Sequence, residues 1–311
     1  MTDFERLMSA FGVAGGDQAI LGDTKTPHLL AVGHSILSAR SVAGLEVETE
    51  EQRDGIRARV RILAGVKLTN PLHLCFGVLH KRGTQRIAME VMLEKGASAT
   101  FIAHCLLPDA VKVRHLMEAQ IEIGEEAQLC YRETHYHGPH GGVKVVPKAQ
   151  VKIARAGRYS SDFTLIVGRV GVLAIDYSVE VGEAAVCELL ARVFAHANDQ
   201  VQITEKIVLA GRNARGLIKT RIALEDDAQG EVTGITEGHA AGARGHVDCL
   251  EIVKDRAVAK AIPIVHVTHP GAKVTHEAAI GSVDQRQLET LMAHGLTPEE
   301  AVEVIVKGIL A

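Results

Sequence analysis

Aromatic residues are scarce in this sequence: tryptophan is absent, and phenylalanine and tyrosine bring the aromatic content to only 3%. A compact β-sandwich usually builds its core on Trp and Phe, so this scarcity argues against that fold. A narrow β-solenoid instead fills its interior with stacked Val, Ile, Leu and Ala. The hydrophobic content of 47% is still large enough for a substantial core.

The chain also lacks long runs of one kind of residue. No stretch of Lys or Arg is long enough to form a duplex-binding stripe, and the net charge is -4, so we expect no nucleic-acid partner. Nowhere do 18 uncharged apolar residues follow one another, and residues 1–20 contain no apolar segment typical of a signal peptide. We therefore expect a cytoplasmic protein without a membrane partner.

Paired cysteines are missing too. The cysteines are odd in number, widely spaced and never in a CxxC pair, which excludes a disulfide framework and a structural zinc ribbon. For most of them the simplest interpretation is a small buried hydrophobic side chain. The five residues are Cys75, Cys105, Cys130, Cys187 and Cys249.

What the chain does contain, from about residue 86 to residue 280, is a succession of short β-type runs. Only Val186–Val193 leaves strand and helix interpretations open. Glycines with a nearby alanine recur every 25 to 33 residues, a spacing typical of a coil that turns at small residues and stacks its rungs ~4.8 Å apart. The sequence thus predicts a β-solenoid in preference to a sandwich. The glycines are Gly96, Gly124, Gly157, Gly182, Gly211, Gly242 and Gly271.

Helical patterns are confined to the two ends. Asp3 to Phe11 carries Phe4, Leu7 and Met8 at helical spacing, which predicts a short amphipathic helix that covers an end. Near the other end, Thr297 has the position of an N-cap before a helix.

The C-terminal segment is predicted to be a helical hairpin, with a first helix that opens at Asp284 and stops at Gly295. The hairpin either caps the open end of the solenoid or docks a partner, and periodicity alone favours capping. We accordingly divide the chain into an N-terminal region with a short helix and the first strands, a β-helix core and a C-terminal hairpin. The three ranges are 1–85, 86–281 and 282–311.

A histidine-rich segment lies near the middle of the chain. Alternate residues of an extended segment point the same way, so His135 and His137 are placed to chelate one ion. A metal site of this kind also needs a carboxylate a few residues further on, and none follows. Solvated histidines, including His140, are therefore the favoured interpretation.

Residues 211–220 begin like a phosphate-binding loop. Two apolar residues separate Gly216 from Lys219, whereas a P-loop needs its lysine directly after that glycine to reach the phosphates. We expect no ATP hydrolysis by this chain, and any nucleotide-driven step needs a second protein.

The stretch from Gly238 to Gly281 holds one cysteine and five histidines among short β runs, and the carboxylate of Glu277 directly follows the last histidine. Alternation places Cys249 on one face of its strand, and it places His276 and Glu277 on opposite faces of theirs. These two side chains then bind one ion together only through a bulge or with ligands from a second chain. Composition alone favours a buried thiol and a surface histidine.

From about Gln85 to the end, the sequence resembles the SufB/SufD family of iron-sulfur cluster assembly scaffolds. The motifs that carry this resemblance occur in the family's order and are specific in combination. They are Asp248-Cys249, Ile262-Pro263, Val274-Thr275-His276-Glu277-Ala278-Ala279-Ile280-Gly281, Asp284-Gln285-Arg286-Gln287-Leu288, Gly295-Leu296, Glu300-Ala301 and Ile305-Val306-Lys307-Gly308-Ile309.

The resemblance implies a fold and a set of roles. The family fold is a right-handed parallel β-helix with helical termini. Cys249 matches the cysteine on which SufB builds a nascent cluster, and His276 and Glu277 match residues near the SufB-SufD interface. Cys105 lies near the SufB cysteine that receives sulfur and passes it inward. The hairpin from 284 to 310 resembles the region that docks SufC, an ABC-type ATPase.

Two departures from the family pattern matter. The chain lacks most of SufB's N-terminal extension, and it carries Cys249 together with His276-Glu277, where SufD lacks the cysteine. Thr275 also replaces a glutamate that precedes the histidine in SufB. We therefore expect a compact, stand-alone scaffold that forms a homodimer through the C-terminal part of the β-helix, so that two copies complete one ligand set.

The resulting hypothesis is de novo assembly of a transient iron-sulfur cluster in a SUF-type system, without catalysis by the chain itself. A sulfur donor supplies sulfur, iron binds at Cys249, His276 and Glu277, and recipient apoproteins take the product. One alternative is a SufD-like anchoring subunit without its own cluster. Another is a β-solenoid enzyme acting on a polysaccharide, which predicts secretion and a line of charged residues on one sheet.

Overall fold

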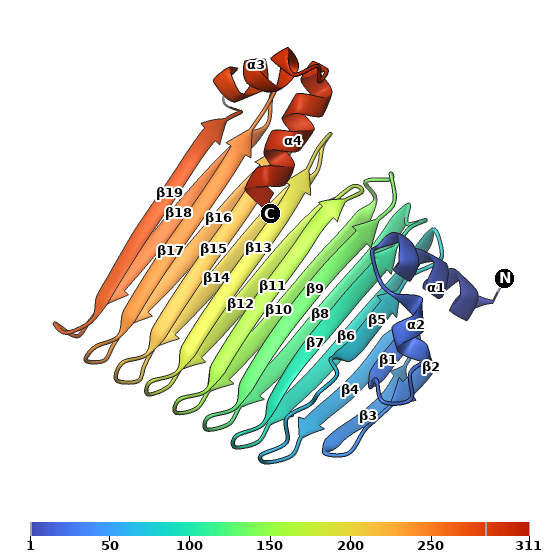
Figure 1. Cartoon of the computed structure of the whole chain (residues 1–311), viewed down its shortest axis with the longest axis vertical. Helices are drawn as coiled ribbons and strands as arrows, with labels where there is room; N and C mark the ends of the chain where they lie inside the picture. The colour runs from blue at the N-terminus through green and yellow to red at the C-terminus, as the bar shows by residue number, and fades with distance from the viewer. Residues whose placement is uncertain (1, 284, 311) are drawn as a thin grey trace.

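The computed structural model describes residues 2–283 and 285–310. These residues form two long sheets that face each other, and the chain alternates between the sheets as it advances along the solenoid (Figure 1). From the fourth strand to the seventeenth, each strand pairs in parallel with the strand two elements further on. The prediction of a parallel β-solenoid flanked by helices is confirmed.

The described residues place ten strands in sheet A and nine in sheet B. Sheet A consists, in spatial order, of β2 (Ser35–Arg40), β1 (His28–Val32), β5 (Leu72–Gly77), β7 (Ser98–Leu107), β9 (Gln128–His137), β11 (Arg158–Val167), β13 (Val186–Ala195), β15 (Arg215–Leu224), β17 (Arg244–Val253) and β19 (Lys273–Ser282). Sheet B consists of β3 (Leu45–Gln52), β4 (Gly55–Ile62), β6 (Arg82–Leu93), β8 (Lys112–Ile123), β10 (Val143–Ile153), β12 (Val172–Val181), β14 (Gln200–Leu209), β16 (Gln229–Gly238) and β18 (Val258–Val267).

The core lies between the two sheets and follows directly from residue alternation. In β14, Val201, Ile203, Glu205, Ile207 and Leu209 are buried, and the residues that alternate with them face outward. Because the parallel register is kept from rung to rung, inward positions stack in columns of aliphatic side chains. The segment with competing interpretations, Val186–Val193, lies in strand β13.

The turns at one side of the solenoid repeat as regularly as the strands. At each of them one residue has a positive φ, and its N–H donates to a carbonyl of the next rung, so the turns form their own ladder. The glycine series marks these turns, but only Gly96 and Gly242 occupy the left-handed position itself. The other left-handed residues in this series are Glu126, Ala156, Ala184 and Asn213.

The N-terminal end is closed by antiparallel pairs, in which β2 folds back on β1 and β3 on β4. Helix α1 (Asp3–Val13) packs on the outer face of sheet A through Leu7, Met8 and Phe11, while Phe4 is exposed. The helix therefore covers a face near the end, and the short helix α2 (Gln18–Gly22) follows it. Parallel pairing starts before residue 86, with β1 on β5 and β4 on β6.

The C-terminal helix α4 (Pro298–Leu310) lies against sheet A, and α3 (Gln285–Ala293) lies beyond the ends of the last strands and contacts α4 (Figure 1). Val302, Val306 and Leu310 of α4 pack on Ala223 of β15. The prediction that the hairpin caps the open end is wrong, because the last strands remain exposed and the apolar stripe of α4 is buried on the outer face of a sheet. The expected helix start at Asp284 lies outside the described residues.

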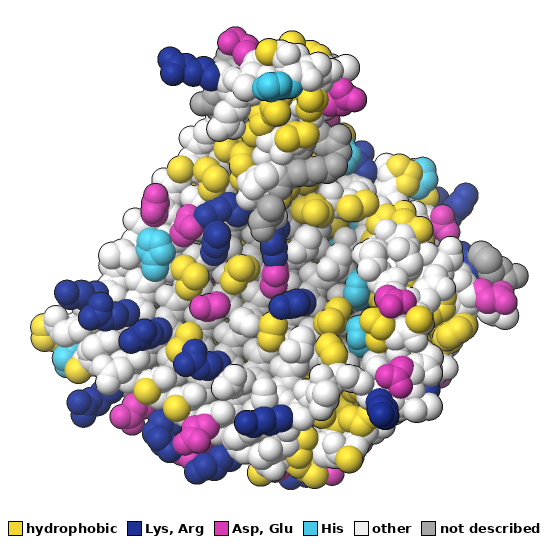
Figure 2. Space-filling view, viewed as in Figure 1, with side chains coloured by type: hydrophobic (Ala, Val, Ile, Leu, Met, Phe, Trp, Pro, Cys, Tyr) yellow, Lys and Arg dark blue, Asp and Glu magenta, His cyan; other side chains and the backbone are white. Residues whose placement is uncertain are grey.

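None of the helices in the described part of the chain has the length and apolar character needed to span a lipid bilayer. The outer face seen in Figure 2 carries basic and acidic side chains intermixed, and hydrophobic side chains gather around the C-terminal helices.

Candidate functional site

Cys249 lies in β17, the last strand but one of sheet A. In the parallel register Thr220 of β15 is on one side of it and Ala278 of β19 on the other. Its side chain points into the space between the sheets and is only 3% exposed. The thiol therefore lies in the interior. Toward the C-terminal end of the solenoid, β19 is the one strand of sheet A that follows it.

Two buried carboxyl groups accompany this thiol. Glu251 is two residues further along β17, and Glu205 of β14 accepts a hydrogen bond of 3.0 Å from the Thr220 hydroxyl. Burial raises the pKa of each of these carboxyls to about 7. Burial, and next the proximity of Glu251, raises the pKa of Cys249 to about 12, so in the isolated chain it is a neutral thiol at physiological pH.

The other two expected site residues follow each other in β19. His276 pairs in register with Val247 and Glu277 with Asp248, and the ladder has no bulge at this point. Val247 is fully buried, so His276 faces the interior, as Cys249 does, while Glu277 faces outward. Asp248 is held on the outer face by an ion pair of 2.5 Å with Arg221.

Cys249 and His276 thus share a face on adjacent strands but are two residues apart in register. Among the residues that the structure describes, the three expected ligands are not within metal-chelating distance of one another. Partial burial, together with the nearby His246, lowers the pKa of His276, which favours the neutral, ligating form of the imidazole.

The surroundings of His276 are unusually open for an interior position. Val265, Val267 and Ile280 point the way core residues do, yet they are 44%, 42% and 48% exposed because no further rung covers them. This exposed apolar surface is called the open end below.

Cys105 is far from this region, in β7, and is fully buried. Its sulfur is 3.9 Å from the Glu133 carboxylate and 3.9 Å from the sulfur of Met117. The ligand atoms of Cys105, His115 and His135 lie within 4.8 Å of one another. Together with Glu133 and His137 these residues form a buried polar group, which we call the central cluster: Cys105, His115, Glu133, His135 and His137. The sequence analysis had named three of its members, Cys105, His135 and His137.

The structure corrects the interpretation of the histidine-rich segment. His135 and His137 are each only 1% exposed and point into the core, whereas His140 is exposed. The expectation of solvated histidines is wrong for the first two, because β9 runs through the segment and alternation turns both inward.

Two members of the central cluster were missed by the sequence analysis. The carboxylate was sought after the histidines, but Glu133 comes two residues before His135 on the same face of β9. Glutamate and histidine at alternate positions of one strand were the available signal. No such signal existed for His115, because only the packing of the two sheets across the core brings its strand β8 opposite β9.

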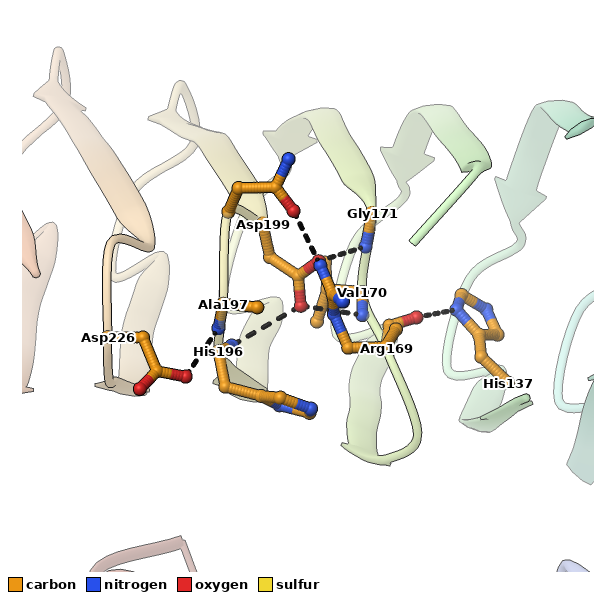
Figure 3. Close-up of polar contacts among 9 residues, drawn as sticks. His137, Arg169, Val170, Gly171, His196, Ala197, Asp199 and Asp226 are labelled. Atoms are coloured by element: carbon orange, nitrogen blue, oxygen red, sulfur yellow. Dashed lines mark hydrogen bonds and ion pairs between the residues drawn. The ribbon is translucent and has the colours of Figure 1, made fainter. Parts of the chain in front are cut away.

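A polar network at the turn between β11 and β12 holds one edge of the central cluster (Figure 3). Asp199 accepts hydrogen bonds from the N–H groups of Val170 and Gly171 and from the Arg169 guanidinium. The Arg169 carbonyl is thereby fixed 2.9 Å from His137 Nδ1. A carbonyl only accepts, so His137 carries its proton on Nδ1 and presents a free electron pair on Nε2.

Comparison with known proteins identifies the family. Residues 80–309 match the family model described as "SUF system FeS cluster assembly, SufBD core domain". The "Iron-sulfur cluster assembly SufBD family protein" of Methanocaldococcus jannaschii is 39% identical over 286 residues, covering 92% of this chain and 90% of the relative. Its namesake in Pyrococcus horikoshii is 33% identical over 308 residues, covering 99% and 94%.

A more distant relative with the same description, from Archaeoglobus fulgidus, is 26% identical over 256 residues, covering 81% of this chain and 67% of the relative. The matched region includes the β17 and β19 strands of the open end as well as the central cluster. The chain belongs to the SufBD family of iron-sulfur cluster assembly proteins.

Proposed function

We propose that this chain is the scaffold on which a transient iron-sulfur cluster is built where the open ends of two copies meet. Cys249 supplies the thiolate, and His276 and Glu277 complete the coordination. The observation that carries the proposal is that the interior-facing Cys249 and His276 lie in the last two strands of sheet A, beside apolar surface that no rung covers.

In this proposal two copies form a homodimer through the exposed edges of β18 and β19. The last strand of each sheet offers unpaired backbone groups and exposed apolar side chains, which a second copy can cover. A two-fold interface brings two copies of each ligand to one place, which offsets the separation of the three ligands within one chain.

The chemistry needs a thiolate, and burial opposes one. Iron binding removes the thiol proton, and movement of the covering strand lets water reach the sulfur. If sulfur arrives as a persulfide, the Cys249 thiolate attacks the outer sulfur, a persulfide forms on Cys249 and the donor leaves as a thiolate. Mixed sulfur, nitrogen and oxygen ligation holds a cluster less firmly than four thiolates, which suits its release.

The energy for such a movement comes, in this proposal, from a SufC-like ABC ATPase that docks at the C-terminal hairpin. Between α3 and α4 lies an exposed groove lined by Leu291, Val304 and Ile309. We also propose, from the family resemblance, that Cys105 relays sulfur toward Cys249, through the interior in which both are buried.

One observation favours a second candidate function. A thiol that is 3% exposed, with a pKa of about 12, is poorly suited to capture sulfur, so a SufD-like anchoring subunit without its own cluster is the alternative. The polysaccharide-acting enzyme gains no support from the family match.

Anaerobic reconstitution with iron and sulfide tests the proposal. Wild type and Cys187→Ala, which removes a fully buried thiol remote from the open end, are expected to develop the visible charge-transfer absorption of a cluster. Cys249→Ala is expected to lose it, with its iron content. An unchanged spectrum in Cys249→Ala excludes this thiol as the assembly site and leaves the anchoring role.

A further inference from the structure

The central cluster lies where a β-solenoid ordinarily has only aliphatic side chains. Its five side chains are buried: Cys105 and His115 are 0% exposed, His135 and His137 1%, and Glu133 3%. Burying this many polar groups is costly unless each finds a partner. The arrangement of these groups therefore calls for an explanation of its own.

The hydrogen bonds assign the protons in the cluster. Because His137 Nε2 is an acceptor, the 3.4 Å contact to His135 Nδ1 requires that His135 donates from Nδ1. His135 Nε2 then accepts a hydrogen bond from the Glu133 carboxyl 2.6 Å away, so one proton lies between these two atoms, and a bound ion would replace it. The sulfur of Cys105 approaches the same carboxyl oxygen at 3.9 Å. A nitrogen, an oxygen and a sulfur thus converge on one point.

A second observation, independent of these hydrogen bonds, is the state of His115. It is fully buried, and neither of its ring nitrogens has a hydrogen-bond partner among the residues that the structure describes. Burial lowers its pKa to about 3, so the ring is neutral and one nitrogen has a free electron pair. An unpaired buried group of this kind costs about 1–3 kcal/mol. Its ligand atom lies within 4.8 Å of those of Cys105 and His135.

From this geometry we infer a buried site for one divalent first-row transition ion, held by Cys105 Sγ, His115, His135 Nε2 and the Glu133 carboxylate. Thiolate, imidazole and carboxylate together suit zinc or ferrous iron in a tetrahedral arrangement. One thiolate and one carboxylate neutralise the charge of the ion, so the core gains no net charge. His137 and the Arg169 carbonyl form the outer shell that orients His135.

A route to the site is present in sheet B. A cavity of about 30 Å³ is lined by Glu133 inside the core and by Glu118 and Lys148 on the outer surface. Pro147 lies beside it and has no N–H to donate, and pairing between β10 and β12 is interrupted at this position. The cavity is large enough to hold a water molecule between Glu133 and the outer face of sheet B.

The site shares Cys105 with the proposed sulfur relay but contains none of the three proposed cluster ligands, so the experiment is performed on the full chain carrying Cys249→Ala. Co²⁺ serves as the probe after chelator treatment. We expect about one Co²⁺ per chain, a thiolate-to-cobalt charge-transfer band, and displacement by Zn²⁺ or Fe²⁺ in separate arms. Failure here leaves the assembly proposal untouched, because the open end has been disabled beforehand.

Matched variants locate the ion. His115→Leu replaces an unpartnered buried ring by an apolar side chain, so it is expected to fold, keep its thermal midpoint without metal, and bind Co²⁺ at least about tenfold more weakly. Cys105→Ala is expected to lose the charge-transfer band. His104→Leu and Cys187→Ala change a buried histidine and a buried cysteine outside the cluster and are expected to bind like the parent. A folded parent that binds no Co²⁺, or an undiminished band in Cys105→Ala, overturns the inference.

Discussion

At its N-terminal end the solenoid is closed by the antiparallel pairs β1–β2 and β3–β4, whereas at its C-terminal end β18 and β19 present a free edge. The first arrangement ends the parallel stack with strands that fold back and a helix that covers apolar surface. The second leaves Val265, Val267 and Ile280 exposed in positions that would be core one rung earlier. The N-terminal end thus buries its apolar side chains within the chain, whereas the C-terminal end leaves them exposed, which is the surface that the proposed homodimer uses.

The largest effect is expected from a matched pair of substitutions in one inward column of sheet A. Ile222 in β15 is fully buried, and Ile280 occupies the same column two rungs later, at the open end. Ile222→Ala should lower the free energy of unfolding by about 2–5 kcal/mol, because it leaves a cavity. Ile280→Ala should cost about 0.5 kcal/mol or less in the monomer.

Denaturant unfolding at low protein concentration measures both values. Equal losses for the two variants would show that β19 is covered in the monomer and would remove the contrast between the ends.

A second prediction concerns pH. The pKa of Glu251 is raised to about 7 by burial, against an ordinary value of 4.5, so the folded chain keeps a proton that the unfolded chain has lost between these values. Stability therefore falls as pH rises from about 4.5 to about 7. Glu251→Gln removes the titrating group. The free energy of unfolding should therefore fall by about 1–3 kcal/mol less between pH 4.5 and neutral pH than it does in the wild type.

The control for this prediction is Glu180→Gln, on the exposed outer face of β12. Thermal unfolding across the pH range should give the wild-type slope for this variant. A wild-type slope in Glu251→Gln as well would mean that its carboxyl group is not buried in solution.

The smallest effect is expected at the helices that flank the two ends. Both α1 and α4 begin with a capping box: Thr2 with Glu5, and Thr297 with Glu300, each with hydrogen bonds of 2.8 and 3.2 Å. Thr297→Ala should cost about 0.5–2 kcal/mol of local stability. Hydrogen exchange of the first turn of α4 measures this loss, and unchanged protection contradicts it.

Much of the architecture could be predicted from sequence because it depends on local patterns. Alternation of apolar and polar residues fixes which side chains of a strand face the core, and the 25 to 33 residue spacing of glycines fixes the rung length. The Thr297 cap was found for the same reason, since its partner Glu300 is three residues away. The opposite orientation of His276 and Glu277 also followed from alternation.

What escaped prediction depends on how separate elements pack on one another. His115 and His135 are 20 residues apart, and their rings lie 5.8 Å apart because β8 and β9, which belong to different sheets, face each other across the core. The placement of α4 on β15 was missed for a similar reason, because periodicity shows that a helix has an apolar stripe but not which surface covers it. The prediction of solvated histidines was wrong for His135 and His137, because β9 runs through this segment and alternation turns both side chains inward.

The central claim, that a cluster is built where two open ends meet, is tested most directly by measuring the mass and the visible absorption of one reconstituted variant. Ile280→Asp places a charge on the open end, while Met92→Asp places one on an equally exposed side of sheet B. We predict that Met92→Asp remains a dimer and forms a cluster, and that Ile280→Asp is a folded monomer without one. A monomeric Ile280→Asp with full cluster absorption would contradict the account.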